Sequence, residues 1–131
     1  MKLILVIDDE KNMCLLLRRM FKKEFNVVAC NSGMDALLWL KQGTVPDLIV
    51  TDIKMPLVSG IEFVKGLKKS GIYRDIPIIL LSGSIDGTEQ QRGLEAGAFA
   101  YIQKPFDPDV LKGTIHNAMI SDRNEELLEN P

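Results

Sequence analysis

Short apolar runs alternate with stretches of helical periodicity along the whole chain. The runs predict five strands, at residues 3–7, 27–30, 48–51, 76–81 and 100–103. After each run, apolar residues recur every three or four positions, which is the spacing of a helix that packs one face on a core. The pattern therefore predicts five consecutive strand–helix units.

The first and last helices have the clearest apolar faces. The first is expected to bury a stripe made of Met13, Leu16, Leu17, Met20 and Phe21. The last is expected to begin with Asp107 as its N-cap and Pro108 at its first helical position. Its expected inner face consists of Val110, Leu111, Thr114, Ile115, Ala118 and Met119.

The fourth helix, expected at residues 86–97, has the weakest pattern. Asp86 is a candidate N-cap, and Glu89 follows three residues later, as in a capping box. However, Leu94 is its only large apolar residue, and two glycines lie inside it. We therefore expect a weakly held and exposed helix.

The predicted strands are apolar at nearly every position, which is typical of strands buried on both faces. Such strands form parallel sheets that are covered by helices on both sides and joined by right-handed crossovers. We therefore predict an α/β fold, a flavodoxin-like doubly wound sheet of five parallel strands in the order 2-1-3-4-5. In such sheets the site lies in the crevice at the carboxyl ends of the strands.

Length and charge exclude several classes of protein. A chain of 131 residues fits one domain. Its net charge of -2 argues against a surface selected for nucleic acid or anionic lipid, so neither is an expected direct partner. No run approaches the roughly 18 apolar residues of a membrane span. Cys14 and Cys30 lack the spacing of a disulfide framework or zinc site, and we expect reduced thiols in a cytoplasmic protein.

Polar residues follow four of the five predicted strands at the points where the apolar runs end. They are Asp8, Asp9, Asp52, Ser82 and Lys104. Three carboxylates in one crevice repel each other unless a divalent cation compensates their charge, and ligands that are all oxygen favour Mg²⁺ over zinc. An aspartate beside Mg²⁺ can also act as a nucleophile and carry a phosphoryl group, with a lysine and a hydroxyl on the transferred oxygens.

Each of these residues also has an ordinary structural explanation. Asp8 and Asp9 could be helix caps, Asp52 a turn residue, and Lys104 a solvated surface lysine. Their occurrence together, each at the end of an apolar run, favours the metal and phosphoryl site.

Five segments in order resemble one known family. They are residues 6–10 (Val-Ile-Asp-Asp-Glu), 47–60 (from Asp47 through Asp52, Met55 and Pro56 to Gly60), 81–83 (Leu-Ser-Gly), 95–98 (Glu-Ala-Gly-Ala) and 101–106 (Tyr-Ile-Gln-Lys-Pro-Phe). Over about residues 2–120, the sequence resembles the receiver domain of two-component response regulators, the family of the single-domain chemotaxis regulator. Each segment is weak alone, but the ordered set is highly specific.

The resemblance implies a role for each matching residue. Asp52 would be the phosphoacceptor, and Asp9 and the backbone carbonyl of Lys54 would join it as Mg²⁺ ligands, with Asp8 acting through bound water. Ser82 and Lys104 would hold the phosphoryl oxygens. Gly83 would leave the approach to Asp52 open. The peptide bond between Lys104 and Pro105 would be cis, and Tyr101 would be a switch residue that changes between exposed and buried states as Ser82 moves.

The same resemblance implies a signalling phosphoacceptor and no enzyme with a separate substrate. Its phosphoryl donor would be a sensor histidine kinase or phosphotransfer protein. The face of helix 4, strand 5 and helix 5 would contact a partner or an output domain, or a second copy of the phosphorylated chain. A Mg²⁺-dependent phosphatase with an Asp nucleophile, or a receiver-like binding module without phosphorylation, are the alternatives from other classes.

Residues 121–131 follow the predicted domain as a charged segment with two apolar residues, Leu127 and Leu128. The segment contains no pattern of a DNA-binding or catalytic motif. We interpret it either as the tail of a stand-alone regulator or as the start of a linker that extends the last helix toward another domain, and Pro131 favours the linker.

Overall fold

The computed structural model describes the backbone of residues 1–129 and the side chains of residues 1–120. Asn130 and Pro131, the end of the predicted tail, lie outside the described residues. Five strands and five helices alternate strictly along the chain. They are β1 (Leu3–Ile7), α1 (Lys11–Phe21), β2 (Asn26–Cys30), α2 (Gly33–Leu40), β3 (Leu48–Asp52), α3 (Gly60–Lys68), β4 (Ile78–Ser82), α4 (Gly87–Glu95), β5 (Ala100–Gln103) and α5 (Pro108–Glu129).

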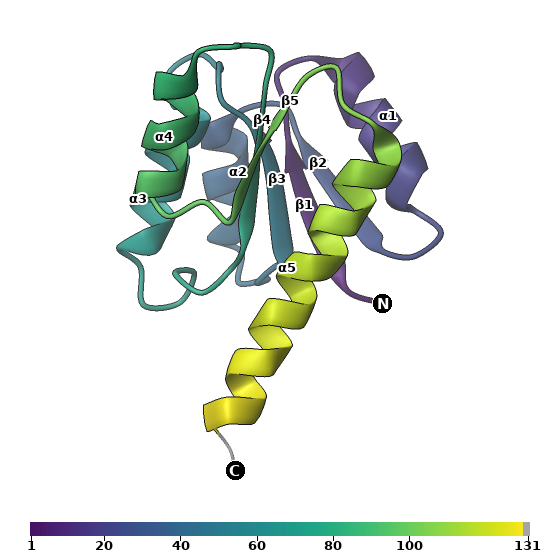
Figure 1. Cartoon of the computed structure of the whole chain (residues 1–131), viewed down its shortest axis with the longest axis vertical. Coiled ribbons are helices and arrows are strands. Elements are labelled where there is room, and N and C mark those ends of the chain that lie inside the picture. Colours follow the sequence, from purple (N-terminus) through teal and green to yellow (C-terminus); the bar gives the residue numbers. More distant parts are fainter. Residues whose placement is uncertain (130–131) are drawn as a thin grey trace.

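The strands form one parallel sheet in the order β2-β1-β3-β4-β5, which confirms the predicted fold class. All four strand pairs are parallel. Figure 1 shows α1 and α5 on one face of this sheet and α2, α3 and α4 on the other. Every strand therefore ends at the same edge of the sheet, where the polar residues of the sequence pattern gather.

Each face of the sheet has its own core. On the α1 and α5 side, the buried helix residues are Cys14, Leu17 and Phe21 of α1 and Leu111, Ile115 and Ala118 of α5. On the opposite side, α2 and α3 cover the sheet with Ala36, Leu40, Ile61, Phe63, Val64 and Leu67. Because β1, β3 and β4 contribute side chains to both cores, these central strands are apolar at nearly every position.

Two residues of the predicted helix stripes do not belong to the core. Leu16 is 47% exposed and Val110 is 55% exposed. The stripe of α1 is centred on Cys14, Leu17 and Phe21 instead, and each helix residue lies about 100° around the axis from its neighbour. Leu16 and Val110 are therefore each turned away from the sheet, next to the buried Leu17 and Leu111.

Two of the least buried elements, α4 and β5, lie in contact with each other. In α4, Gly93 is the only buried residue, so the prediction of an exposed helix is confirmed. A Cβ at Gly93 would lie 2.6 Å from Cδ1 of Leu80, which explains a glycine inside this helix. The edge strand β5 is partly exposed along its whole length. β4 begins at Ile78, two residues later than predicted, directly after Pro77, which has no N–H to donate.

The last helix continues without a break through Glu129 and extends past the sheet in Figure 1. The predicted domain end near residue 120 thus falls inside a helix, and the boundary stays a prediction. Within residues 1–129, no helix has both the length and the apolar content needed to cross a membrane.

Gly60, the first residue of α3, packs directly against the end of β3. Its N–H donates a hydrogen bond of 2.8 Å to the carbonyl of Ile53, and a Cβ at this position would overlap the carbonyl oxygen of Asp52. Ser59 caps the same helix with a capping box to Glu62. The start of α3 is therefore fixed against the backbone of Asp52.

We expect Gly60→Ala to destabilise the domain by at least about 2 kcal/mol, because backbone atoms must move to admit the methyl group. Gly66→Ala is the matched control on the same helix, since a Cβ there meets nothing within 4 Å. The control should gain roughly 0.5–1 kcal/mol from higher helix propensity. Urea unfolding of both variants measures this difference, and equal stabilities would contradict the packing argument.

Candidate functional site

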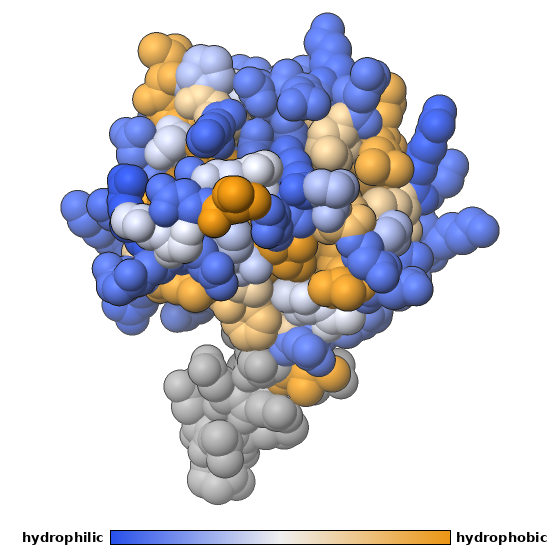
Figure 2. Space-filling view, turned by 45° about the horizontal axis from the view of Figure 1, so that its top comes forward, coloured by the Kyte–Doolittle hydropathy of each residue, from blue (hydrophilic) through white to orange (hydrophobic). Residues whose placement is uncertain are grey.

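Three carboxylates converge where β1 and β3 end. Asp52 is the last residue of β3, and Asp8 follows β1 directly, one position beyond the paired residues Ile7 and Thr51. One carboxylate oxygen each from Asp8, Asp9 and Asp52 lies within 4.8 Å of the others. Asp8 is 1% exposed and Asp52 is 7% exposed, while Asp9 is open to solvent. Figure 2, with this end of the molecule turned forward, shows a largely hydrophilic surface with separate apolar groups.

Lys104 brings the compensating positive charge. Its Nζ lies 3.0 Å from Oδ2 of Asp8 and 3.4 Å from Oδ1 of Asp52. The backbone N–H of Lys104 donates a hydrogen bond of 2.7 Å to the carbonyl of Ser82, so the residue is held directly beside the end of β4. The peptide bond between Lys104 and Pro105 is cis. One ammonium group thus bridges the two buried carboxylates.

The pKa values of Asp52 and Lys104 are both raised, for different reasons. Burial raises the pKa of Asp52, and the neighbouring charge of Lys104 offsets only part of that effect. Burial alone would lower the pKa of Lys104, but its hydrogen bond to Asp8 and the charge of Asp52 outweigh burial and raise it. The charge of Lys104 therefore compensates the buried carboxylates only in part, and a second cation in the crevice would stabilise the ionised form of Asp52.

The donor set fits a hard cation. The three side chains offer only carboxylate oxygens, and at least one of them faces solvent, which leaves room for metal-bound water. Lys54 lies two residues after Asp52, just beyond the end of β3, and its side chain is exposed. Oxygen ligands with space for water suit Mg²⁺ better than zinc.

Ser82 and Tyr101 are joined to each other through Glu89 of α4. The Ser82 hydroxyl donates to Oε1 of Glu89 and accepts a 3.1 Å hydrogen bond from the N–H of Ser84. The Tyr101 hydroxyl lies 3.0 Å from the carbonyl oxygen of Ser84 and 3.3 Å from the same Glu89 oxygen. Burial is the main cause that raises the pKa of Tyr101, so its hydroxyl remains a donor. Tyr101 is half-buried in this arrangement.

Sequence reasoning placed Glu89 in a different role. The spacing from Asp86 indicated a capping box, but the Asp86 side chain caps α4 alone, by accepting from the N–H of Thr88. Glu89 instead points back toward the end of β4. No spacing signal connects it to Ser82, because the contact depends on how α4 lies against the sheet. Gly83, beside Ser82, has open space around its Cα, as a Cβ there would meet nothing within 4 Å.

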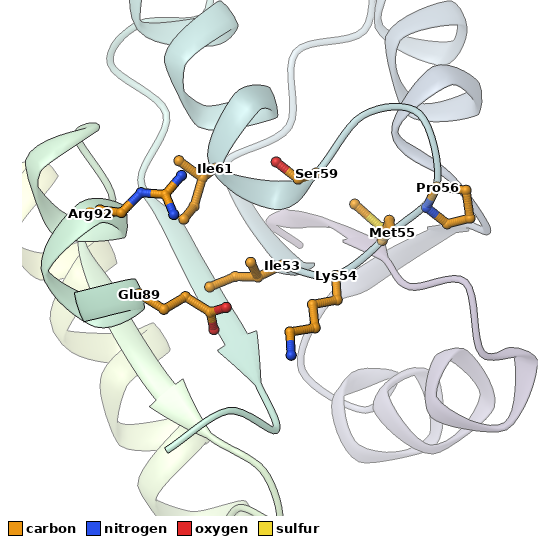
Figure 3. Close-up of a pocket in the computed structure, with 8 residues that line it drawn as sticks. All are labelled: Ile53, Lys54, Met55, Pro56, Ser59, Ile61, Glu89 and Arg92. Carbon is orange, nitrogen blue, oxygen red and sulfur yellow. The ribbon is translucent and has the colours of Figure 1, made fainter. Parts of the chain in front are cut away.

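Glu89 also borders a cavity of about 440 Å³ between α4 and the segment that follows β3. Figure 3 shows Glu89 and Arg92 on the α4 side, Lys54 on the other side, and Ile53 between Glu89 and Lys54. The apolar lining residues Ile53, Met55 and Ile61 are buried, whereas Lys54 and Arg92 are exposed. The cavity therefore joins an apolar lining to two cationic side chains and one carboxylate.

Comparisons with known proteins agree with this geometry. The family model described as the response regulator receiver domain matches residues 4–116. A receiver domain structure from Clostridium thermocellum superimposes with a TM-score of 0.86 at 28% identity, covering 98% of this chain and 99% of that one. The chain belongs to the response regulator receiver domain family, and it is therefore a signalling phosphoacceptor domain of two-component systems.

Curated relatives are longer than this chain. The probable transcriptional regulator ycf29 of Pyropia yezoensis is 36% identical over 130 residues, which are 98% of this chain and 58% of that protein. The phosphate regulon transcriptional regulatory protein PhoB of Escherichia coli is 37% identical over 120 residues, or 88% of this chain and 51% of PhoB. The chain thus spans a little over half the length of these two relatives.

We expect Lys104→Met to destabilise the metal-free domain by about 3 kcal/mol, because it leaves two buried carboxylates without their cation. The loss should be smaller when Asp52 is already replaced by Asn, since one of the two charges is then absent. Lys65→Met, at an exposed position of α3, is the control and should change stability by less than about 0.5 kcal/mol. Urea unfolding in a chelating buffer measures the wild-type protein and the four variants, which are Lys104→Met, Asp52→Asn, their combination and Lys65→Met. An equal loss in both backgrounds would show that Lys104 does not act through Asp52.

Proposed function

We propose that Asp52 is the phosphoacceptor of this domain and that its phosphorylation depends on Mg²⁺. The observation that supports the proposal is the cluster of Asp8, Asp9 and Asp52 beside the ammonium group of Lys104. Asp9, Asp52 and the backbone carbonyl of Lys54 would bind the ion directly, and Asp8 would bind it through water. The ion would supply positive charge for the transferred phosphoryl group.

Four residues of the chain would then contribute to the transfer of the phosphoryl group. The Asp52 carboxylate attacks the phosphorus atom of the donor, and the bond from phosphorus to the donor breaks with its electron pair leaving on the donor. Lys104 moves from its ion pair with Asp52 to a phosphoryl oxygen, where its charge offsets the added negative charge. Ser82 donates its hydroxyl proton in a hydrogen bond to another oxygen. Gly83 leaves the approach to Asp52 free of a side chain.

The same residues would catalyse hydrolysis of the aspartyl phosphate, in which water attacks the phosphorus atom, inorganic phosphate forms and the Asp52 carboxylate is regenerated. The domain would act on no other substrate. The donor would be a sensor histidine kinase or a phosphotransfer protein, and we propose a cytoplasmic location for this exchange. A separate phosphatase of the kind that carries an Asp-x-Asp pair after its first strand fits less well, because this chain has Asp8 and Asp9 adjacent. A binding module without phosphorylation would not need the buried charges.

The output surface would be the face of α4, β5 and α5. Leu94 of α4, Phe99 just before β5 and Val110 of α5 are 42%, 41% and 55% exposed. This face carries the most weakly buried helix and strand, and weakly held elements are those that a ligand can shift. It would contact an output domain, a partner protein or a second phosphorylated copy. The longer relatives that are named transcriptional regulators make an attached output domain our preferred case.

We expect the purified protein to be labelled by acetyl phosphate in the presence of Mg²⁺, on Asp52 alone. Asp52→Asn should lose the label without unfolding, because the amide is nearly isosteric but is not a nucleophile. Intact-mass measurement after incubation, with circular dichroism of the variant, tests this expectation. Undiminished labelling of the variant would refute the assignment.

Mg²⁺ should raise the melting temperature of the wild-type domain, because it relieves repulsion among three carboxylates and binds only the folded state. Asp9→Ala should lose most of this rise, and the control Asp109→Ala, at the exposed start of α5, should retain it. Thermal unfolding over a Mg²⁺ titration gives both results. If the wild-type domain does not respond while Asp9→Ala is more stable without metal, the cluster binds no ion.

A further inference from the structure

The Ser82 hydroxyl has a single proton, which it directs at Glu89 in a hydrogen bond. A hydroxyl donates one hydrogen bond, and here that bond goes to Oε1 of Glu89. The oxygen of Ser82 already accepts from the N–H of Ser84. Among the described residues, no hydrogen bond connects Ser82 to Asp52. In this structure, the only donor capacity of Ser82 is therefore directed at α4 and away from the phosphoacceptor.

A phosphoryl group on Asp52 would need the same proton. Phosphoryl oxygens are acceptors, so Ser82 can bind them only by donating. Because Ser82 is 1% exposed, water cannot easily replace a partner that it gives up. Glu89 and the phosphoryl group therefore compete for one hydroxyl, and each can be satisfied only at the other's expense.

Tyr101 depends on the same carboxylate. Its hydroxyl is within hydrogen-bond distance of Oε1 of Glu89 and of the Ser84 carbonyl, so Glu89 links the end of β4 at Ser82 to Tyr101 of β5. A Glu89 side chain released by Ser82 has new partners nearby, since Lys54 and Arg92 line the cavity that it borders. Arg92 lies three residues along α4, a spacing at which side chains on a helix meet.

We propose that Glu89 is a positioning residue that holds Ser82 and Tyr101 in the unphosphorylated arrangement and opposes phosphorylation of Asp52. When the Ser82 hydroxyl donates its hydrogen bond to the phosphoryl group instead, the Glu89 carboxylate turns into the cavity beside Lys54 and Arg92. The positions of α4 and of the Tyr101 side chain then change together. This inference rests on the proposed role of Asp52, and it adds a residue on α4 that sets how easily the site is occupied.

Beryllofluoride, a phosphoryl mimic, measures the competition when it is titrated with Mg²⁺ by calorimetry. Glu89→Ala frees Ser82 and should bind the mimic about five- to tenfold more tightly than the wild-type protein, a coupling of ordinary size. Glu89→Gln keeps an acceptor oxygen and should show less than half of that gain. Glu95→Ala, on the same helix and hydrogen-bonded only to Gln91 among the described residues, is the matched control and should bind like the wild type.

A double-mutant cycle tests whether the effect passes through Ser82. In a Ser82→Ala background, Glu89→Ala should give no further gain, because the contested hydroxyl is absent. The same gain in that background would overturn the proposal, as would an unchanged or weaker affinity of Glu89→Ala in the wild-type background. An equal gain for Glu89→Gln and Glu89→Ala would also overturn it, by showing that loss of charge is the cause.

Amide hydrogen exchange on the unliganded proteins separates this proposal from that of the phosphoacceptor. Without Glu89, the first turn of α4 loses its hydrogen bonds to Ser82 of β4 and to Tyr101 of β5, so Glu89→Ala should exchange faster over residues 83–90 than Glu95→Ala. Equal exchange would overturn the role of Glu89 even where beryllofluoride binds. Wild-type protein that binds no beryllofluoride would refute the site at Asp52, and the exchange data would still decide whether Glu89 holds the loop.

Discussion

The contact of one ammonium group with two buried carboxylates is the interaction on which the site depends. A parallel sheet covered on both faces leaves its strand ends as the main place where polar side chains can gather. Asp8 and Asp52 lie there almost without solvent, and their mutual repulsion persists unless a cation lies between them. Lys104, which follows β5 directly, supplies this cation. The ends of β1 and β3 are therefore electrostatically coupled to the edge strand β5.

This coupling gives the site a firm side and a weak side. The firm side consists of β1, β3 and the start of α3, where Gly60 packs on the backbone of Asp52 and no side chain can intervene. The weak side consists of α4 and β5, which bury little. The groups on the firm side therefore stay in place when negative charge is added to Asp52, whereas the elements on the weak side can move at small cost in free energy. If Asp52 is the phosphoacceptor, as we propose, a signal that starts there would travel toward the weak side for this reason.

The sequence was sufficient to predict the sheet, but not to predict which residues each helix buries. Strands that are apolar at nearly every position indicated a parallel sheet covered on both faces, and the five strand–helix units favoured the observed strand order. The polar residues at the strand ends then predicted that Asp8, Asp52 and Lys104 meet. Leu16 and Val110 were placed in the core wrongly, because a 3.6-residue period cannot decide between two adjacent apolar positions. Glu89 was read as a cap, since only the packing of α4 brings it to Ser82.

The limits of sequence reasoning also show where receiver domains with the same phosphoacceptor chemistry can differ. The carboxylates, the lysine and the hydroxyl are fixed by the reaction, which needs each at one place. The partner that holds the hydroxyl before reaction is not fixed in this way. A domain whose competent arrangement is only partly populated binds its ligand more weakly by that fraction. In our proposal, Glu89 sets this fraction without touching the reacting atoms. The readiness of the site for phosphorylation would then depend on α4, a helix that also belongs to the proposed output surface.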